Sequence, residues 1–476
     1  MDTSTSNNFP SVNAERQDAL AFAYQYGFPL YAYGRFTKAH IDTPNNAFYH
    51  QRDLIKADFT KVVRPNNDTL YSFIFYDLSQ SDLCFHVPEI VDRYWAFSYY
   101  DMYANNFANV GSQTFDKPGK YLLSYDPENL QYGVRKDGAN SEYLGTINSP
   151  TPYGIFLARL VVFDDEDKKM VNGFQDAMKV ITAKRSSGAL APVFDRNIFV
   201  EVAQSTDGPV SEAEQVLRLT AALAQINPSE VVQDRSWIAT TLEKAGIKNG
   251  KFNQPPGTSL EDAVAAANKS VQATVLSAGM MKPLGNGWTF SSSLISGDFH
   301  SFYSARHLVA MRGYLQPTAD QSIYPSWYPK SQSPDGIGSA CHIGPKQAIL
   351  FSFSGKPRTN HSGFWSLTIY NSAQLLVANQ LDRYSLGDRS NLDYPDGTSL
   401  RDRADGKFEI LVQPDDVVPP AKYINNWLPA PAGGGLISFN LRVFAPAVEM
   451  VDGTYQYPEV TVIDAITPER RMSTRL

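Results

Sequence analysis

The sequence is poor in cysteine and contains no long run of one kind of side chain. Its 476 residues include only two cysteines, Cys84 and Cys341, which provide no disulfide framework and are compatible with a reducing compartment. No window approaches the roughly 18 apolar residues of a membrane-spanning helix, and the opening residues lack the basic and apolar regions of a secretory signal. Lysine and arginine are scattered and the formal net charge is −7, which disfavours nucleic acid as a partner. We therefore expect a cytoplasmic protein without a membrane span.

The common catalytic and cofactor motifs are absent as well. There is no GxSxG, HExxH or CxxC motif, no phosphate-binding loop of the GxxxxGKS or GxxxxGKT type, and no GxGxxG after a strand. The seven histidines are dispersed. His300 and His307 are too far apart along a helix to bind one metal ion without a ligand from elsewhere. We therefore expect neither a metal nor an organic cofactor.

Aromatic residues, in contrast, are abundant. The chain has 26 tyrosines and 27 phenylalanines, more rings than a core of this size needs. Tyrosine offers an apolar face together with a hydrogen-bonding tip. Some of these rings are therefore expected to line a cavity for a small molecule.

The length and the local patterns predict several units. A chain of 476 residues is too long for one compact core. A helix is expected over residues 13–33, ended or kinked at Pro29. Short alternating runs between Pro, Gly and Asn turns predict strands, and capped segments of helical period separate two such β regions. We predict a mainly β fold, with an N-terminal helical arm at 1–36, a β-sandwich at 37–164, an α-helical segment at 165–283 and a second β-sandwich at 284–476.

One pattern occurs twice. YWAFSYYD at 94–101 and FWSLTIYN at 364–371 agree in residue type at every position, and an Ala-Asn pair follows each tryptophan at the same distance, ending at Asn109 and Asn379. An aromatic strand, YSFIF or FSFSG, precedes each copy. The repetition predicts two related β domains, with Trp95 and Trp365 at equivalent places.

The segment VRPNNDTLYS at 63–72 allows two interpretations. In the first it is a turn: Pro65 holds Arg64 in an extended conformation, Asn and Asp side chains close the turn, and Arg64 pairs with Asp68. In the second it is the polar rim of an aromatic-walled pocket, because such pockets need a few fixed polar groups. The second interpretation predicts that Arg64, Asn67, Asp68 and Tyr71 border the main pocket.

These patterns give a set of candidate site residues. The tryptophans can also be core anchors of their sandwiches, whereas buried amides and carboxylates are costly unless they are paired. Asp68 or Asp101 beside tyrosines are candidates for a general base. The candidate catalytic residues are Arg64, Asp68, Tyr71 and Tyr100, and the candidate binding residues are Asn67, Trp95, Phe97, Tyr99, Asp101, Asn109, Trp365, Tyr370 and Asn379.

The ordered blocks of the sequence resemble a two-domain family. VRPNNDTLYS followed by YWAFSYYDMYANNFANVG resembles domain of unknown function twelve-fifty-four. LVANQLDRYSLGDRS, NWLPAPAGG, LRVFAP and MVDGTYQYP resemble its C-terminal companion, domain of unknown function twelve-fourteen. The resemblance implies an immunoglobulin-like sandwich, a helical segment and a jelly roll, and it implies a homo-oligomer. It implies no single reaction, although some fungal members accompany natural-product pathways.

The absence of catalytic machinery and the excess of rings favour one function over two others. We expect a cofactor-independent cyclase or isomerase that acts on an apolar terpenoid or polyketide, for example a pericyclase for an intramolecular Diels–Alder reaction. Such chemistry needs a shaped pocket and hydrogen-bond donors to a carbonyl. The alternatives are a hydrolase or hydro-lyase with an Asp general base, and a non-catalytic binding protein.

Overall fold

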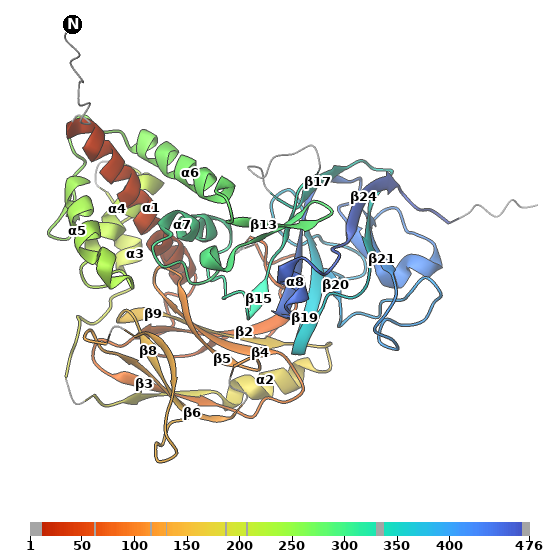
Figure 1. Ribbon diagram of the computed structural model, residues 1–476, viewed down its shortest axis with the longest axis horizontal. Helices are drawn as coiled ribbons and strands as arrows, with labels where there is room; N and C mark the ends of the chain where they lie inside the picture. The colour runs from red at the N-terminus through yellow and green to blue at the C-terminus, as the bar shows by residue number, and fades with distance from the viewer. Residues whose placement is uncertain are drawn as a thin grey trace, which may run out of the picture.

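The computed structural model describes residues 12–60, 63–114, 117–129, 131–185, 188–205, 208–329 and 338–468. Two β-sandwiches lie side by side, and a layer of helices packs against the N-terminal one (Figure 1). The prediction of a mainly β fold with two sandwiches and an N-terminal helix is confirmed. None of the helices in these ranges combines the length and apolar character that crossing a membrane requires.

The N-terminal sandwich consists of two five-stranded sheets. Strand β10 pairs with β3 in the second sheet, so this sandwich continues past residue 164, where we expected it to end. Helix α2 (Lys168–Ala177) leads into β10. The first sheet has the order β1-β2-β9-β4-β5 (Tyr49–His50, Thr69–Asp77, Tyr153–Val161, Trp95–Asp101, Asn106–Gly111) and the second the order β10-β3-β6-β8-β7 (Lys179–Ala183, Asp82–Val87, Gly119–Tyr125, Gly145–Ser149, Gly133–Lys136).

The C-terminal sandwich is also built from two main sheets. The first has the order β15-β23-β19-β20 (Ser322–Ile323, Gly435–Pro446, Thr359–Tyr370, Ser385–Gly387) and the second the order β22-β21-β18-β24 (Trp427–Ala430, Phe408–Pro414, Gln347–Phe353, Glu459–Asp464). Smaller elements complete it: β13 (Met281–Gly285), β14 (Trp288–Ser291), η2 (Ser293–Ile295), β16 (Ser326–Trp327), β17 (Ala340–Ile343), η3 (Ala421–Asn426) and α8 (Glu449–Asp452).

The two sandwiches share one topology. In chain order β2, β3, β4, β5, β6, β8, β9 and β10 correspond to β15, β18, β19, β20, β21, β22, β23 and β24, and these eight pair with one another in the same order; β1, β7 and β17 are added at the edges. Even the one parallel pair of each second sheet, β6 with β8 and β21 with β22, is repeated. The predicted duplication is confirmed. We expected an immunoglobulin-like domain followed by a jelly-roll domain. We did not expect that both domains share one strand order.

Trp95 and Trp365 occupy equivalent places, each buried in the core of its own sandwich. The residue after each tryptophan lies opposite a glycine, Gly111 or Gly387. A Cβ at Gly111 would lie 2.4 Å from the Trp95 carbonyl oxygen, and one at Gly387 would lie 2.0 Å from that of Trp365. Both glycines are therefore required by the close approach of the neighbouring strand.

Two details of the expected repeat are wrong. Asn109 lies opposite Ser98 in β5, whereas Ser385 lies opposite Thr368 at the equivalent point, and Asn379 belongs to the loop before β20. The second hairpin has a longer connection, so equal spacing in sequence does not give equivalence in space. FSFSG forms part of β18 in the second sheet, whereas YSFIF lies in β2 of the first.

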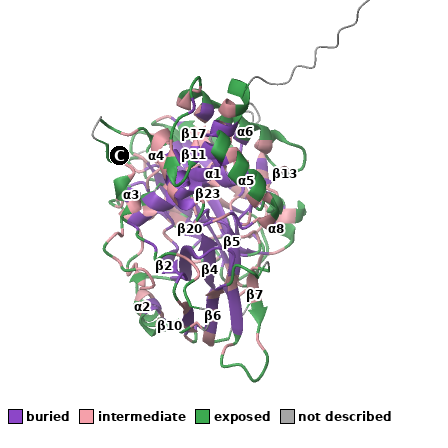
Figure 2. Cartoon of the chain, turned by 90° about the vertical axis from the view of Figure 1, so that its left-hand side faces the viewer, coloured by how far each residue is buried: buried purple, intermediate pink, exposed green. Residues whose placement is uncertain are grey.

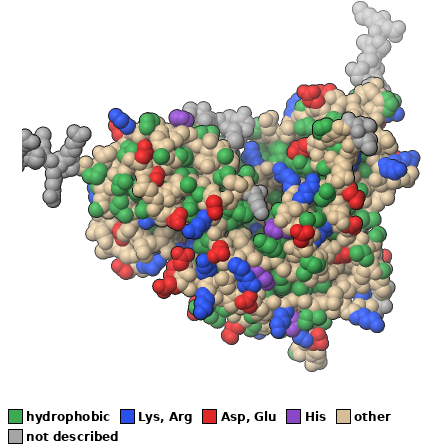
Figure 3. All heavy atoms as spheres, turned by 180° about the vertical axis from the view of Figure 1, so that it is seen from behind, with side chains coloured by type: hydrophobic (Ala, Val, Ile, Leu, Met, Phe, Trp, Pro, Cys, Tyr) green, Lys and Arg blue, Asp and Glu red, His purple; other side chains and the backbone are tan. Residues whose placement is uncertain are grey.

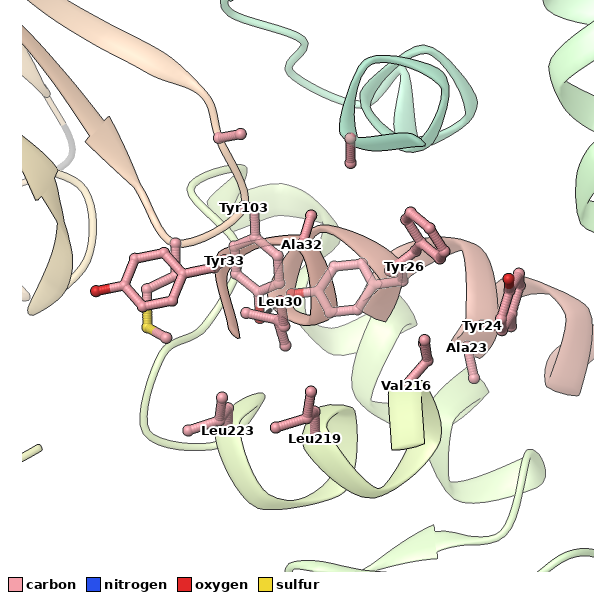
Figure 4. Close-up of a cluster of buried hydrophobic side chains, with 14 of the residues drawn as sticks. Ala23, Tyr24, Tyr26, Leu30, Ala32, Tyr33, Tyr103, Val216, Leu219 and Leu223 are labelled. Carbon is pink, nitrogen blue, oxygen red and sulfur yellow. Dashed lines mark hydrogen bonds between the residues drawn. The ribbon is translucent and has the colours of Figure 1, made fainter. Parts of the chain in front are cut away.

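The helical layer surrounds α1 (Val12–Lys38), which continues through Pro29. The helix therefore does not end at 27–29, which was one of the two expected outcomes. Gly27 packs so tightly on α4 that a Cβ there would lie 1.7 Å from the Thr220 Oγ1, and this packing outweighs the hydrogen bond that Pro29 removes. Leucines of α4 lie beneath α1 (Figure 4). The other elements are α3 (Ile198–Glu201), α4 (Glu212–Leu223), η1 (Val232–Asp234), α5 (Arg235–Lys244), β11 (Ile247–Lys248), β12 (Lys251–Phe252), α6 (Leu260–Leu276) and α7 (Tyr303–Arg312).

The two first sheets pack against each other through a small apolar cluster. Tyr94 and Phe364, which are equivalent in the repeat, meet with their ring centroids 5.7 Å apart, and Phe444 lies against both. The strands of this contact are among the buried elements seen in Figure 2. Polar residues of both sandwiches surround this cluster.

Candidate functional site

Two short segments cross between the sandwiches, and we call the region where they cross the junction. The first crossing segment, residues 64–68, leaves the N-terminal sandwich and binds β19 and β23. The Tyr370 hydroxyl donates to the Pro65 carbonyl at 2.9 Å, and Arg442 Nη2 donates to the Arg64 carbonyl at 3.3 Å. The carbonyls of this segment are therefore held by side chains of the other domain.

The second crossing segment, residues 315–321, makes the reciprocal contact. The Tyr100 hydroxyl donates to the Leu315 carbonyl at 3.1 Å, and Arg159 Nη2 donates to the same oxygen at 3.0 Å. The Gln321 carbonyl of this second segment accepts a hydrogen bond from the Ala445 amide. The Asp68 carbonyl of the first segment accepts one from the Val162 amide in the same way. QPTADQSIYP at 316–325 is thus the counterpart of RPNNDTLYS.

Asp68 is fully buried and belongs to the contact between domains. Its carboxylate accepts from Ser366 Oγ at 2.6 Å and Ser385 Oγ at 3.0 Å, and it pairs with Arg389. The expected Arg64–Asp68 pair is therefore wrong, because the C-terminal domain supplies a better-placed cation. Burial alone would raise the pKa of Asp68, but the charges of Arg389 and Arg442 and the hydrogen bonds hold that pKa below its ordinary value.

Arg64 has a left-handed backbone, with φ of +49°. The expected extended conformation before Pro65 is wrong, because the Arg64 amide donates to the Gln374 carbonyl at 2.8 Å and its own carbonyl binds Arg442. A left-handed non-glycine residue costs free energy and persists where its surroundings overdetermine it. Here the C-terminal domain supplies that constraint.

The Arg64 side chain is fixed by amides. Its Nε donates to Gln374 Oε1 at 2.7 Å and its Nη1 to Asn440 Oδ1 at 3.4 Å. Its Nη2 has no hydrogen bond within the described part of the chain. Burial lowers the pKa of Arg64, and so do the neighbouring charges of Arg312 and Arg442. A half-buried guanidinium with a spare donor and like charges nearby favours an anionic or oxygen-rich ligand.

Arg159 and Arg442 are equivalent in the repeat. Arg159 lies on β9 opposite Ala96, and Arg442 lies on β23 opposite Ser366. Arg159 also faces Tyr71 on β2, and its guanidinium carbon lies 6.0 Å from the centre of that ring. The same ladder, continued one residue beyond β15, brings Tyr324 opposite Arg442.

Hydroxyl groups complete the two arginine sites in the same way. Arg159 Nη1 donates to Ser98 Oγ at 3.4 Å and to the Tyr100 hydroxyl at 3.3 Å. Arg442 Nη1 donates to Thr368 Oγ1 at 2.8 Å, and its Nη2 donates to the Tyr370 hydroxyl at 2.5 Å. Ser98 and Thr368, like the two tyrosines, follow their tryptophans at equal distances. The junction thus contains two copies of one Arg–Tyr–hydroxyl arrangement.

The junction carries an excess of positive charge. Across the described ranges, Arg64, Arg159 and Arg442 form no ion pair with a carboxylate; amide, hydroxyl and carbonyl oxygens accept their hydrogen bonds. Asp68 is already paired with Arg389. Figure 3 shows basic side chains in the depression where the C-terminal lobe meets the rest of the molecule. Cations without a counter-ion attract an anion or a polarisable oxygen.

Sequence reasoning missed Arg159, Arg442 and Tyr324. The signal for the arginines was a single charge in the middle of an apolar strand, FLARLVVF and FNLRVFAP. A charge in such a place is costly unless it is paired. The two strand sequences are also similar to each other, and that similarity would have identified both arginines.

The remaining candidates lie in several places. Trp95, Phe97, Tyr99 and Trp365 pack in the two sandwich cores. Asn67 donates to the Ile55 carbonyl, Asn109 to Asn106 Oδ1 and Thr318 Oγ1, and Asn379 to carbonyls of its own loop. Asp101 lies in a separate buried cluster. The junction therefore brings together Arg64, Asn67, Asp68, Tyr71, Tyr100 and Tyr370, and Asn109 contacts its second crossing segment through Thr318, whereas the others lie apart.

A surface hollow of about 540 Å³ lies elsewhere, between the start of α1 and α5. Glu15, Arg16, Glu243 and Lys244 are among its lining residues, and no residue of VRPNNDTLYS is. The expectation that this segment borders the main pocket is not supported by that hollow. The segment contacts the other domain instead.

Comparisons with known proteins concern the whole chain. The model for Protein of unknown function (DUF1254) matches residues 45–182, and that for Protein of unknown function (DUF1214) matches residues 344–448. No curated protein matches the chain. The crystal structure of the VPA0106 protein from Vibrio parahaemolyticus is similar, with 17% identity, a TM-score of 0.61, and coverage of 94% of this chain and 100% of that one. An uncharacterized protein from Burkholderia cenocepacia matches with 11% identity, a TM-score of 0.42, and coverage of 93% and 88%.

Proposed function

We propose, for a chain that belongs to the family in which DUF1254 is followed by DUF1214, that the junction binds an apolar small molecule by an oxygen atom and catalyses its cyclisation or isomerisation without a cofactor. A terpenoid or polyketide is the substrate class, and an intramolecular Diels–Alder reaction is the most specific form. The protein would act in the cytoplasm as a homo-oligomer. Light scattering measures how many subunits it contains.

The observation that supports this proposal is the spare donor of Arg64. Two amide oxygens hold its guanidinium, and no carboxylate neutralises it within the described ranges. A fixed donor of this kind can bind a carbonyl oxygen of the substrate as negative charge develops there. Loss of one such donor lowers kcat by roughly 100- to 1,000-fold in enzymes that use an oxyanion site.

The tyrosines contribute position rather than acid–base chemistry. Tyr71 and Tyr324 are half-buried at the edge of the junction, where their rings can hold an apolar chain in a reactive conformation. A pericyclic reaction transfers no proton and releases no group, so the product has the same mass as the substrate. Bond formation inside one bound conformer and polarisation of one carbonyl are all that the site must provide.

The test uses the purified full-length protein and a panel of linear polyenes that each carry a carbonyl group. We expect conversion to a product of unchanged mass without added cofactor, and a roughly 100-fold lower rate for Arg64→Lys, whose ammonium lacks the planar fork. Tyr71→Phe is expected to lower the rate less. Arg403→Lys and Tyr143→Phe, which alter surface residues, are the matched controls. No turnover of any polyene, or equal rates in all four variants, contradicts the proposal.

The alternative with an Asp general base has weaker support. The carboxylate of Asp68 is fully engaged, and its lowered pKa makes it a poor base. Burial raises the pKa of Asp101 to about 8, which suits acid–base chemistry. However, this carboxyl group accepts two hydrogen bonds from Asn105 and lies in a closed, buried cluster. A bell-shaped pH–rate profile would favour this hydrolase or hydro-lyase. Tight binding without turnover would favour a non-catalytic binding protein.

A further inference from the structure

A second buried cluster lies where the helical layer meets the N-terminal sandwich. Asp101 ends β4, Glu230 precedes η1, and Arg306 lies on α7; all three are buried, with 0%, 4% and 0% exposure. Arg306 Nη1 lies 3.5 Å from Glu230 Oε2. Three distant segments of the chain thus bring two carboxyl groups and one guanidinium into the interior.

Tyrosine rings enclose the guanidinium. The Arg306 carbon Cζ lies 5.0 Å from the ring centre of Tyr26, 4.6 Å from that of Tyr103 and 4.9 Å from that of Tyr303. Tyr26 and Tyr103 also share a hydrogen bond between their hydroxyls at 3.0 Å, as Figure 4 shows. The ring faces stabilise the cation but accept no charge-neutralising hydrogen bond from it.

The charges in this cluster do not balance if both acids are ionised. One guanidinium faces two carboxylates, and Glu230 Oε1, Arg306 Nε and Arg306 Nη1 have no hydrogen-bond partner among the residues that the structure describes. Asp101 accepts from the Asn105 amide at 2.9 Å and from Asn105 Nδ2 at 2.7 Å, and those neutral donors supply no positive charge. A second buried anion without a counter-ion is strongly unfavourable. One of the two carboxyl groups must therefore keep a proton.

We infer that Asp101 and Glu230 share one proton beside Arg306, and that this proton allows the helical layer to pack on the β4–β5 hairpin as a pH-sensitive lock. The unpartnered atoms leave hydrogen-bonding positions for the shared proton and for bridging water. When the proton leaves, Asp101 of the hairpin and Glu230, which Arg306 joins to α7, carry like charges that repel each other. The hairpin also carries Tyr100, which joins Arg159 to the Leu315 carbonyl, so opening the lock also loosens one end of the junction.

The tyrosines around the cluster do not replace this titration. The tyrosines have pKa values that burial raises above their ordinary value, so they stay neutral. Burial raises the pKa of Glu230 and of Asp298 as well, and raises that of Asp101 to about 8. The titratable groups facing the cluster are Tyr26 of α1, Tyr76 of β2, Tyr103 of the hairpin, Tyr132, Asp234, Asp298, His300, Tyr303 and Arg306 of α7, and Tyr314.

The direction of the pH dependence follows from proton linkage. An aspartate has an ordinary pKa of 3.8, so the locked form binds one more proton than the open form between about pH 4 and about pH 8. Opening therefore becomes about tenfold more favourable for each pH unit in that window, and levels off above about pH 8.

Hydrogen–deuterium exchange on the full-length protein tests this lock. After correction for intrinsic exchange, the protection of α7 and the β4–β5 hairpin should fall about 100-fold between about pH 6 and about pH 8. Asp101→Asn, which cannot ionise, should show no such fall, whereas Asp82→Asn, in the same sandwich but outside the cluster, should keep it. An unchanged fall in Asp101→Asn overturns the inference.

Infrared spectroscopy of the wild-type protein keeps the inference testable if Asp101→Asn does not fold. At about pH 6 the folded protein should show the carbonyl stretch of a buried protonated carboxylic acid, and the band should disappear by about pH 9. Absence of that band at about pH 6 overturns the inference, whatever the variant does.

Discussion

Replacing Asp68 by asparagine should weaken the contact between the two sandwiches, so that they no longer unfold together. Asp68 accepts hydrogen bonds from Ser366 and Ser385 and pairs with Arg389, and all of these partners belong to the C-terminal domain. The side chain of Asp68 is 0% exposed and that of Arg389 is 13% exposed. Removing one partner of a buried pair leaves the other charge uncompensated, which typically costs about 3–5 kcal/mol. We expect Asp68→Asn to lose that amount of unfolding free energy.

Urea unfolding and calorimetry measure this loss. The wild-type protein should unfold with its domains coupled, whereas Asp68→Asn should show an earlier, separate transition, because its lost contacts join the domains. Asp82→Asn is the matched control, since Arg185 donates to Asp82 at 3.1 Å from Nε within the N-terminal sandwich. That variant should lose stability without separating the transitions. A loss below about 1 kcal/mol for Asp68→Asn would refute the reasoning, because such a value is typical of an exposed ion pair.

The pH dependence gives an independent check on Asp68. Its folded-state pKa lies below the ordinary value of 3.8, so it stabilises the fold above that value. The stabilisation is lost as the pH falls from about 4 through the lower folded-state pKa. The wild-type protein should therefore lose its advantage over Asp68→Asn below about pH 4. An advantage that persists in strong acid would show that the charge of Asp68 is not the cause.

Two further predictions concern the backbone. Gly111→Ala and Gly387→Ala should each destabilise their own sandwich by about 1–3 kcal/mol, because the added Cβ meets the carbonyl of Trp95 or Trp365; equal thermal stability of both variants and the wild type would contradict the close approach. Arg64→Gly should change the unfolding free energy by only about 1 kcal/mol, since glycine adopts a positive φ without strain, yet it should lower turnover as much as Arg64→Lys; full turnover would exclude the guanidinium from the site.

The sequence predicted the parts of the fold that depend on local pattern. One of the alternating runs that predicted strands forms β2, which is covered on both faces, with Leu70 and Ile74 in the sandwich core and Phe73 and Phe75 against the helical layer. One of the predicted capped segments is α4, which Ser211 caps by accepting from the Glu214 amide. These features follow from side-chain period and local hydrogen bonds, which neighbouring residues determine.

Features that depend on distant residues could not be predicted in the same way. The left-handed conformation of Arg64 is imposed by Gln374 and Arg442, more than 300 residues away in the chain. Pro29 remains inside α1 because α4 packs against the adjacent Gly27. Arg64 and Tyr71 lie at the junction, but the local pattern did not indicate the residues of the other domain that contact this segment. Without the repeat of β9 and β23, nothing local linked Arg159 to Arg442.

The two copies at the junction differ in the charged residues of their crossing segments. Each crossing segment binds the arginine of the other domain, and this reciprocal contact alone would make the junction symmetric. The symmetry is broken where Arg64 and Asp68 stand in the first segment and Leu315 and Gln321 stand in the second. The contact between the two domains needs only the carbonyls, arginines and tyrosines that both copies share. Of these two charged residues Asp68 is engaged by Arg389, Ser366 and Ser385, so Arg64, with its spare donor, is the residue on which the proposed chemistry depends.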